Sequence, residues 1–235
     1  MRSKVGLCIF DFSGSGQSDG DYVTLGWKES DELSQLVQIL IRDYRATQIA
    51  IWGRSMGAAT TIIYSRHNSV FLSSLVLDSP FYSIQEIINQ MVTEKVGVGG
   101  WLISGAAKLL DGQFQSEFNV SLDDLKVGKL SREIRVPASF ILMKEDQLAN
   151  PEKTRKMFNR YGNKDKQLYE CNGKHEDDRD ERVIDQCFEN IIKEFRRGQF
   201  RQRKTMEPSI QYLQRVDSTF MKQQADLFMG NLARA

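Results

Sequence analysis

The residues best suited to chemistry are a serine between two glycines and a histidine later in the chain. The pattern Gly-x-Ser-x-Gly occurs at residues 53–57, with Ser55 at its centre. In this pattern the serine lies on a tight strand-to-helix turn, where glycines relieve backbone crowding and the hydroxyl is presented at the edge of a sheet. The apolar run 48–52 precedes the pattern directly, and a helical run, 58–64, follows it. Ser55 is therefore the candidate nucleophile.

The same pattern occurs a second time, at residues 16–20, with Ser18 at its centre. Residues 13–15 separate it from the preceding apolar run, and no helical pattern follows it directly. We interpret this second copy as a loop. An overlapping Gly-x-Gly also begins a dinucleotide-binding pattern, but the sixth position is Asp19 where that pattern has glycine. Dinucleotide binding is not predicted.

A serine hydroxyl needs a general base, and the chain contains two histidines, His67 and His175. If the helix that follows Ser55 continues to His67, about twelve residues of helix separate the two by ~18 Å. His175 instead follows the apolar run 167–171 in a loop, from which a side chain can reach the top of a sheet. We expect His175 to be the base and His67 to be a surface residue.

The third group should be a carboxylate that fixes the imidazole tautomer, in the chain order serine, acid, histidine. Asp146 satisfies this order and follows the apolar run 138–143. Loops at the carboxyl ends of strands are where α/β folds place functional groups. We expect Asp146 to be the acid. The alternative is Asp78, which closes the run 74–78.

Carboxylates also cluster beside His175, at Glu176, Asp177, Asp178 and Asp180. Such a cluster resembles a set of metal ligands, but a run of carboxylates in a loop is more often solvated. We predict neither a metal nor another cofactor.

These groups would be positioned by an α/β fold with a mostly parallel sheet covered by helices on both faces. Short apolar runs alternate with longer helical stripes, which is the pattern of such a sheet. Helical spacing is clearest within 33–44 and 183–195. The segment 83–135 is too long for a simple crossover, and we interpret it as a helical insertion. The predicted strands are residues 5–12, 48–52, 74–78, 138–143 and 167–171.

The predicted domain covers residues 1–195, and residues 196–235 form a basic, helical tail. We interpret the basic run as a solvated linker to a docking helix. Peripheral contact with acidic lipid or protein is the alternative.

Composition narrows the class of protein. The chain has 235 residues, 40% of them hydrophobic, and a net charge of +1, so nothing indicates a nucleic-acid partner. Three cysteines without close spacing predict neither disulfides nor a zinc site, and they favour a cytoplasmic setting. No apolar stretch approaches the ~18 residues of a membrane span.

Four segments together resemble the α/β-hydrolase superfamily, and within it the branch of serine aminopeptidase-like hydrolases. They occur in the family order, at residues 10–20, 52–57, 76–81 and 173–175. The resemblance covers roughly residues 5–195. It implies Ser55 as nucleophile, Asp146 as acid, His175 as base and the Met56 amide as one donor to the oxyanion.

The resemblance is incomplete at one end. The segment that matches the family's fourth strand begins at Val5, so the first three strands and the loop with the second oxyanion donor have no counterpart. We expect an N-terminally incomplete hydrolase fold that is poorly soluble or nearly inactive alone.

The leading hypothesis is hydrolysis of an ester, thioester or amide, in a small molecule or an acylated protein or peptide, through an acyl-enzyme on Ser55. One alternative is a non-catalytic interaction protein or truncated pseudoenzyme that retains the fold. Another is a module that binds lipid or a small ligand with the insertion, which would not need His175.

Overall fold

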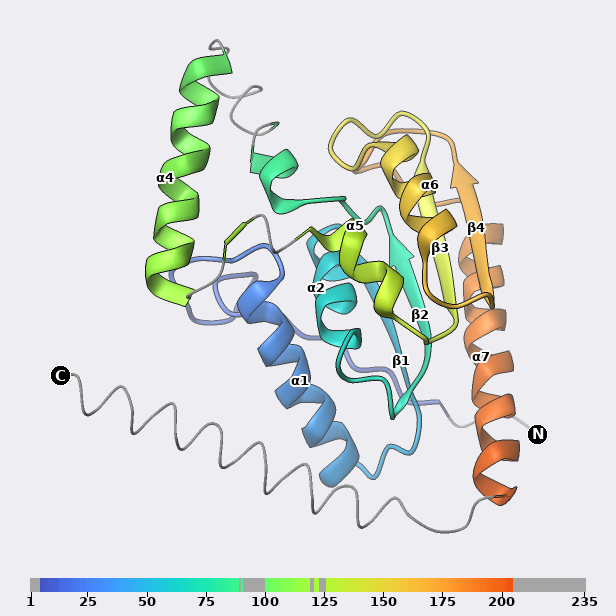
Figure 1. Cartoon of the computed structure of the whole chain (residues 1–235). Coiled ribbons are helices and arrows are strands. Elements are labelled where there is room, and N and C mark those ends of the chain that lie inside the picture. Colours follow the sequence, from blue (N-terminus) through green and yellow to red (C-terminus); the bar gives the residue numbers. More distant parts are fainter. Residues whose placement is uncertain (1–4, 89, 91–99, 119–120, 123–125, 205–235) are drawn as a thin grey trace, which may run out of the picture. The chain divides into compact units, whose positions relative to one another are not determined.

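The site is carried by a sheet of four parallel strands. The fold comes from a computed structural model, which describes residues 5–88, 90, 100–118, 121–122 and 126–204 (Figure 1). In this part of the chain the strands lie in the order in which they occur in the sequence: β1 (Ile49–Arg54), β2 (Leu72–Asp78), β3 (Ala138–Met143) and β4 (Lys166–Cys171). Because all pairings are parallel, the carboxyl ends of the strands share one edge. The α/β class predicted from the sequence is confirmed.

Each face of the sheet packs against its own hydrophobic core. Alternate strand residues point to opposite faces: Leu75 and Leu77 of β2 belong to one core, and Val76 between them belongs to the other. The second core contains Cys187 and Ile191 of α7 (Glu181–Lys204). The first core receives residues from α1 (Trp27–Arg42), α2 (Met56–Ser65), α5 (Val127–Leu130) and α6 (Pro151–Arg160) (Figure 1).

The helix α1 shows how the apolar spacing is used. Leu33 and Val37, one turn apart, are buried against the first core. Tyr44 fits the same spacing in the sequence, yet α1 ends at Arg42 and Tyr44 is exposed. The apolar stripe therefore predicts the buried face of the helix better than it predicts its end.

The helix α6 begins directly after the loop that carries Asp146. Asn150 caps it, because its side-chain oxygen accepts hydrogen bonds from the amides of Glu152 and Lys153. Pro151 occupies the first helical position, where a missing N–H costs nothing. The cap and the proline set where α6 begins, and the loop between β3 and α6 ends there.

Between β2 and β3 the chain forms the helical insertion that the sequence predicts over residues 83–135. Residues 84–88 are helical, and α4 spans Gly100–Phe118. The short helix α5 and the 3₁₀ turn Ser131–Glu133 then lead back to the sheet. Val127 and Leu130 of α5 are buried in the first core, so the end of the insertion is anchored to the domain.

Residues 5–12, predicted to be the first strand, are not a strand, and that prediction was wrong. Among the described residues β1 pairs with β2 alone, and residues 5–12 form no ladder. The side chains of Leu7 and Ile9 are each 83% exposed. An apolar run has local strand propensity, but a strand exists only where a neighbour accepts its backbone hydrogen bonds.

The chain divides into two units, Met1–Phe195 and Arg196–Ala235. The second is described only as far as Lys204: of the tail predicted over residues 196–235, residues 196–204 form the end of α7, and the rest lies outside the described residues. A search of the described helices finds none that is both long and apolar enough to cross a membrane.

Candidate active site

Ser55 alone connects β1 to α2. The strand ends at Arg54 and the helix begins at Met56. The Ser55 backbone has φ 52° and ψ −114°, a conformation that residues with a side chain rarely adopt. Its amide donates to the Asp78 carbonyl at 2.9 Å, which fixes the turn to the end of β2. The half-buried Ser55 is thereby held at the carboxyl edge of the sheet.

A close backbone approach explains the first glycine of the pattern. A Cβ at Gly53 would overlap the Gly57 carbonyl group and lie 2.7 Å from the Ala58 nitrogen. A Cβ at Gly57 would meet nothing within 4 Å. The tight turn therefore requires Gly53, whereas the space around Gly57 admits a larger residue.

His175 lies in the loop between β4 and α7. Its Nε2 atom is 3.0 Å from Ser55 Oγ, although 120 residues separate the two in sequence. The residue is 8% exposed. Two residues earlier, Gly173 has φ 106°, in the range that favours glycine, and it turns the chain back after β4. The loop thus brings the imidazole over the end of the neighbouring strands.

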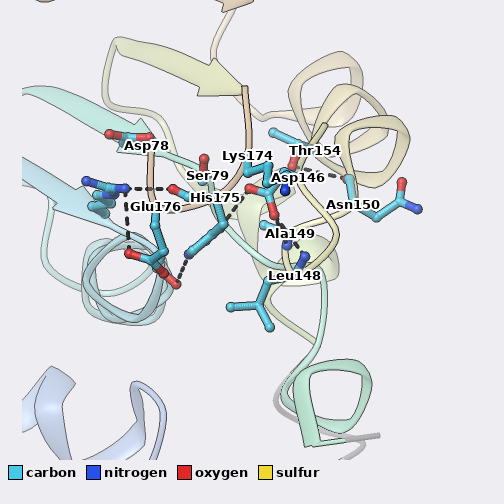
Figure 2. A network of polar contacts seen from close by, with 12 residues as sticks. Asp78, Ser79, Asp146, Leu148, Ala149, Asn150, Thr154, Lys174, His175 and Glu176 are labelled. Atoms are coloured by element: carbon cyan, nitrogen blue, oxygen red, sulfur yellow. Dashed lines mark hydrogen bonds and ion pairs between the residues drawn. The ribbon is translucent and has the colours of Figure 1, made fainter. Parts of the chain in front are cut away.

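Asp146 lies in the loop after β3 and is fully buried at its side chain. Its Oδ2 atom is 2.7 Å from His175 Nδ1. Its Oδ1 atom accepts hydrogen bonds from the amides of Leu148, at 2.9 Å, and Ala149, at 2.7 Å. Figure 2 shows the carboxylate between the imidazole and these two amides. Both oxygens are therefore held in place.

The arrangement dictates how a proton can move. When the Asp146 carboxylate accepts from Nδ1–H, the imidazole is the tautomer whose Nε2 carries a lone pair. That lone pair lies within hydrogen-bond distance of the Ser55 hydroxyl. A hydroxyl, a base and a carboxylate in this order can deliver a proton from oxygen to nitrogen as the oxygen attacks an electrophile.

Asp78, the alternative acid, lies in a different environment. Its carboxylate forms a buried ion pair with Arg179, with the Arg179 Nη2 atom 2.9 Å from Asp78 Oδ1. The Arg179 Nε atom also donates to both oxygens, at 3.0 and 3.1 Å. Asp146, not Asp78, is the carboxylate in contact with the imidazole.

The remaining residues singled out in the sequence lie elsewhere or at the edge of the site. Met56 is the first residue of α2, and the first amides of a helix have no partner within it. Ser18 lies in an exposed turn and donates to the Asp11 carbonyl. His67 lies beyond the far end of α2 and is exposed.

The acidic run beside His175 has structural partners. Asp177 accepts a hydrogen bond from the Lys174 amide at 2.7 Å. Asp180 accepts from the Arg182 amide at 2.9 Å, and the Arg182 guanidinium holds the pKa of the Asp180 carboxyl below its usual range. Within the described ranges no group of three or more His, Cys, Asp or Glu residues is placed to hold a metal ion.

Two arginines at the site were not foreseen. Arg54 donates to the His175 carbonyl at 2.6 Å, and Arg179 donates to the same oxygen at 3.0 Å. In the sequence Arg179 is one basic residue within an acidic run, and its partner Asp78 is 101 residues away. No local pattern indicates that contact. Arg54 occupies a variable position of the Gly-x-Ser-x-Gly pattern, which carries no signal of its own.

A parallel sheet with helices on both faces, and a serine on a strand-to-helix turn at its carboxyl edge, define an α/β-hydrolase. The sequence matches the model of the serine aminopeptidase S33 family over residues 2–124, a little over half of the chain, and the chain belongs to that family. The matched segment includes Ser55, whereas Asp146 and His175 lie beyond it.

Solved structures share the fold. The esterase Pf2001 of Pyrococcus furiosus superposes with a TM-score of 0.55 at 23% identity, covering 82% of this chain and 68% of that one. A structure of DcsB in complex with its substrate analogue gives a TM-score of 0.55 at 17% identity and covers 78% and 79%. An uncharacterized protein of Acanthamoeba polyphaga mimivirus is 26% identical over an alignment of 94 residues, and the match covers 36% of this chain. This match spans about a third, 32%, of that curated relative's length.

Proposed function

We propose that this α/β-hydrolase cleaves an ester, thioester or amide bond through an acyl-enzyme on Ser55. The observation that carries the proposal is one continuous series of contacts, from Ser55 Oγ to the His175 imidazole at 3.0 Å and on to Asp146 at 2.7 Å. The strained backbone of Ser55 supports it, because such strain concentrates at functional sites. Small molecules and acylated proteins or peptides are the proposed substrates.

In the first half of the reaction, Ser55 Oγ attacks the carbonyl carbon of the substrate and His175 Nε2 takes the hydroxyl proton. The tetrahedral intermediate then collapses, and the imidazolium returns that proton to the departing alcohol, thiol or amine. In the second half a water molecule attacks the acyl-enzyme with the same base, which releases the acid and restores the Ser55 hydroxyl. Asp146 fixes the tautomer and stabilises the imidazolium throughout.

The negative charge of the tetrahedral oxygen needs donors close to Ser55. The Met56 amide is proposed as one of them, because it begins α2 beside the nucleophile and the positive end of the helix dipole lies there. Loss of one such donor costs on the order of 10²–10³ in rate. The Met56 donor is a backbone group, so the helix start itself is part of the proposed machinery.

The nucleophile is tested by labelling with a fluorophosphonate probe, followed by mass spectrometry of the modified peptide. We expect one adduct, on Ser55, that is lost in Ser55→Ala and retained in Ser18→Ala. Ser18 is the matched control, since it sits in the second copy of the same pattern. Labelling that persists in Ser55→Ala and disappears in Ser18→Ala would contradict the assignment.

The base and acid are tested by turnover of esters, chosen first because the Pyrococcus furiosus neighbour is named an esterase. We expect His175→Ala to abolish turnover and Asp146→Asn to reduce it by about 10⁴. His67→Ala should leave the rate unchanged, because that imidazole lies beyond the far end of α2. A folded wild-type chain that neither reacts with the probe nor turns over esters would favour the non-catalytic alternative.

A further inference from the structure

The guanidinium of Arg179 is buried and has several partners around the base-bearing loop. Its side chain is 4% exposed. On one side it pairs with the Asp78 carboxylate and donates to the Ser79 hydroxyl at 3.1 Å. On the other side its Nη1 atom donates to the His175 carbonyl at 3.0 Å and also to the Asp177 carbonyl. One side chain thus joins the end of β2 to the loop that carries the proposed base.

The His175 carbonyl also accepts a hydrogen bond from a second guanidinium, that of Arg54. Arg54, the last residue of β1 and the neighbour of Ser55, donates to it at 2.6 Å. The backbone that carries the imidazole is therefore tied to β1 through Arg54 and to β2 through Arg179. These are the two strands whose ends also hold Ser55, since the Ser55 amide donates to the Asp78 carbonyl.

These ties add to the few hydrogen bonds that the loop makes by itself, such as the one between the Lys174 amide and Asp177. Residues 172–180 contain no helix or strand, and Gly173 adopts a positive φ. Productive geometry for a general base must be held to within about 0.5 Å. A displacement of 1 Å can cost about 10² in rate. A fork-shaped guanidinium supplies several donors with fixed relative geometry, which a lysine cannot do.

We propose that Arg179 is a positioning residue: with Asp78 as its counter-ion, it holds the His175 backbone so that Nε2 stays within reach of Ser55 Oγ. This inference rests on the proposed function of His175 as the base. It also assigns Asp78 a role as the anchor of the positioning arginine, distinct from the role of Asp146.

The test separates positioning from stability with three variants. Arg179→Met alone leaves the Asp78 carboxylate buried without its partner, which destabilises the fold. The double variant Arg179→Met with Asp78→Asn removes both charges and is the informative protein. Arg179→Lys keeps a charge but loses the fork, and we expect it not to restore the rate. The matched control is Arg182→Met, which removes an exposed arginine paired with Asp180.

The readout is turnover of two esters that differ in their leaving group. An alkyl ester needs a proton from His175 as the alkoxide departs, whereas a p-nitrophenyl ester does not. In the folded double variant we expect kcat for the alkyl ester to fall about 10² with little change in KM. The loss for the p-nitrophenyl ester should be smaller, because only the step that protonates the leaving group is spared while both esters still need His175 as the base for attack. Rates are taken per folded molecule, so an unchanged rate for the alkyl ester in the folded double variant would overturn the proposal.

Hydrogen exchange of the loop makes the outcome independent of catalysis. In the double variant, amides of residues 172–180 should exchange faster than in the wild type, while those of β3 keep their protection. Unchanged exchange in the loop would overturn the proposal. If the wild-type chain neither labels nor turns over either ester, the proposed function fails, and the exchange data still decide whether Arg179 holds the loop.

Discussion

The serine turn combines a strained backbone with a contact that only glycine permits. Ser55 has φ 52°, and its amide is tied to Asp78. The strand before it passes so close to the start of α2 that Gly53 has no room for a side chain. The strained turn is thus flanked by the close packing of β1 against α2 and by the hydrogen bond from the Ser55 amide to Asp78. The two glycines of the pattern consequently have different structural roles.

A pair of glycine substitutions tests this difference. Gly53→Ala should destabilise the protein by about 3 kcal/mol, because the added methyl group meets backbone atoms that cannot rotate away. Gly57→Ala should be neutral or stabilising by about 0.5–1 kcal/mol, since alanine favours a helix and the space is open. Urea unfolding of the wild type and of both variants gives the change in the free energy of unfolding for each substitution. Equal destabilisation by both substitutions would contradict the described geometry.

At the residue scale, the sequence predicts the groups that local patterns mark. Ser55 follows from the glycines around it, and His175 and Asp146 follow from their places after apolar runs. The structure brings these three into contact, while their chemical roles stay predictions until they are tested. The contact between Asp78 and Arg179 could not be found in this way, because it joins residues 101 positions apart that no motif includes.

At the scale of elements, the smaller core lies between α7 and the strands β2, β3 and β4. Cys187 of α7 and Cys171 of β4 are buried there, whereas Cys8 is exposed. Burial raises the pKa of the Cys187 thiol to about 11. Since the thiolate is the reactive form, both burial and the raised pKa protect Cys187. Thiol chemistry therefore reports on whether α7 stays in place.

We expect a disulfide reagent at pH 8 to modify one of the three thiols quickly in the native protein, that of Cys8. Cys171 and Cys187 should react only as the protein unfolds. The fast phase should be absent in Cys8→Ser, which serves as the control. Two or three thiols that react at one rate under native conditions would mean that α7 does not cover them.

The strands predicted from the sequence are confirmed where another strand lies beside them and pairs with them. The runs at 48–52, 74–78, 138–143 and 167–171 became β1 to β4, each within two residues of its predicted bounds. Residues 5–12 have the same apolar character but form no ladder. Propensity is a property of the segment, whereas pairing depends on the rest of the fold, and the sequence reports only the first directly.

At the scale of the whole molecule, several buried groups link stability to alkaline pH. Burial raises the pKa of the Tyr161, Tyr64 and Cys187 side chains. The folded chain therefore keeps protons that the unfolded chain releases at its ordinary pKa values, about 10 for tyrosine and 8.5 for cysteine. Because the unfolded state then binds fewer protons, stability falls as the pH rises above about 9.

The variant Tyr161→Phe isolates one of these groups. At pH 8 the wild type should be more stable by about 1 kcal/mol, because Tyr161 donates to the Val136 carbonyl at 2.8 Å. Above pH 10 this advantage should shrink by up to about 1.4 kcal/mol for each pH unit. Denaturant unfolding of both proteins at pH 8, 9.5 and 10.5 measures the stability difference at pH 8 and its decrease at higher pH. An advantage that stays constant up to pH 10.5 would show that Tyr161 is not shielded from solvent.

The strands of the sheet lie in the order in which they occur in the chain, and this order has a consequence during synthesis on the ribosome. Each strand can add to the edge left by the one before it, so the sheet can grow as the chain emerges. The proposed nucleophile and base are 120 residues apart, which at on the order of 5–20 residues per second separates their appearance by about 6–24 s. Throughout that interval the nascent chain carries Ser55 without its base. Any hydrolytic activity begins only when β4 and the loop after it have left the ribosome.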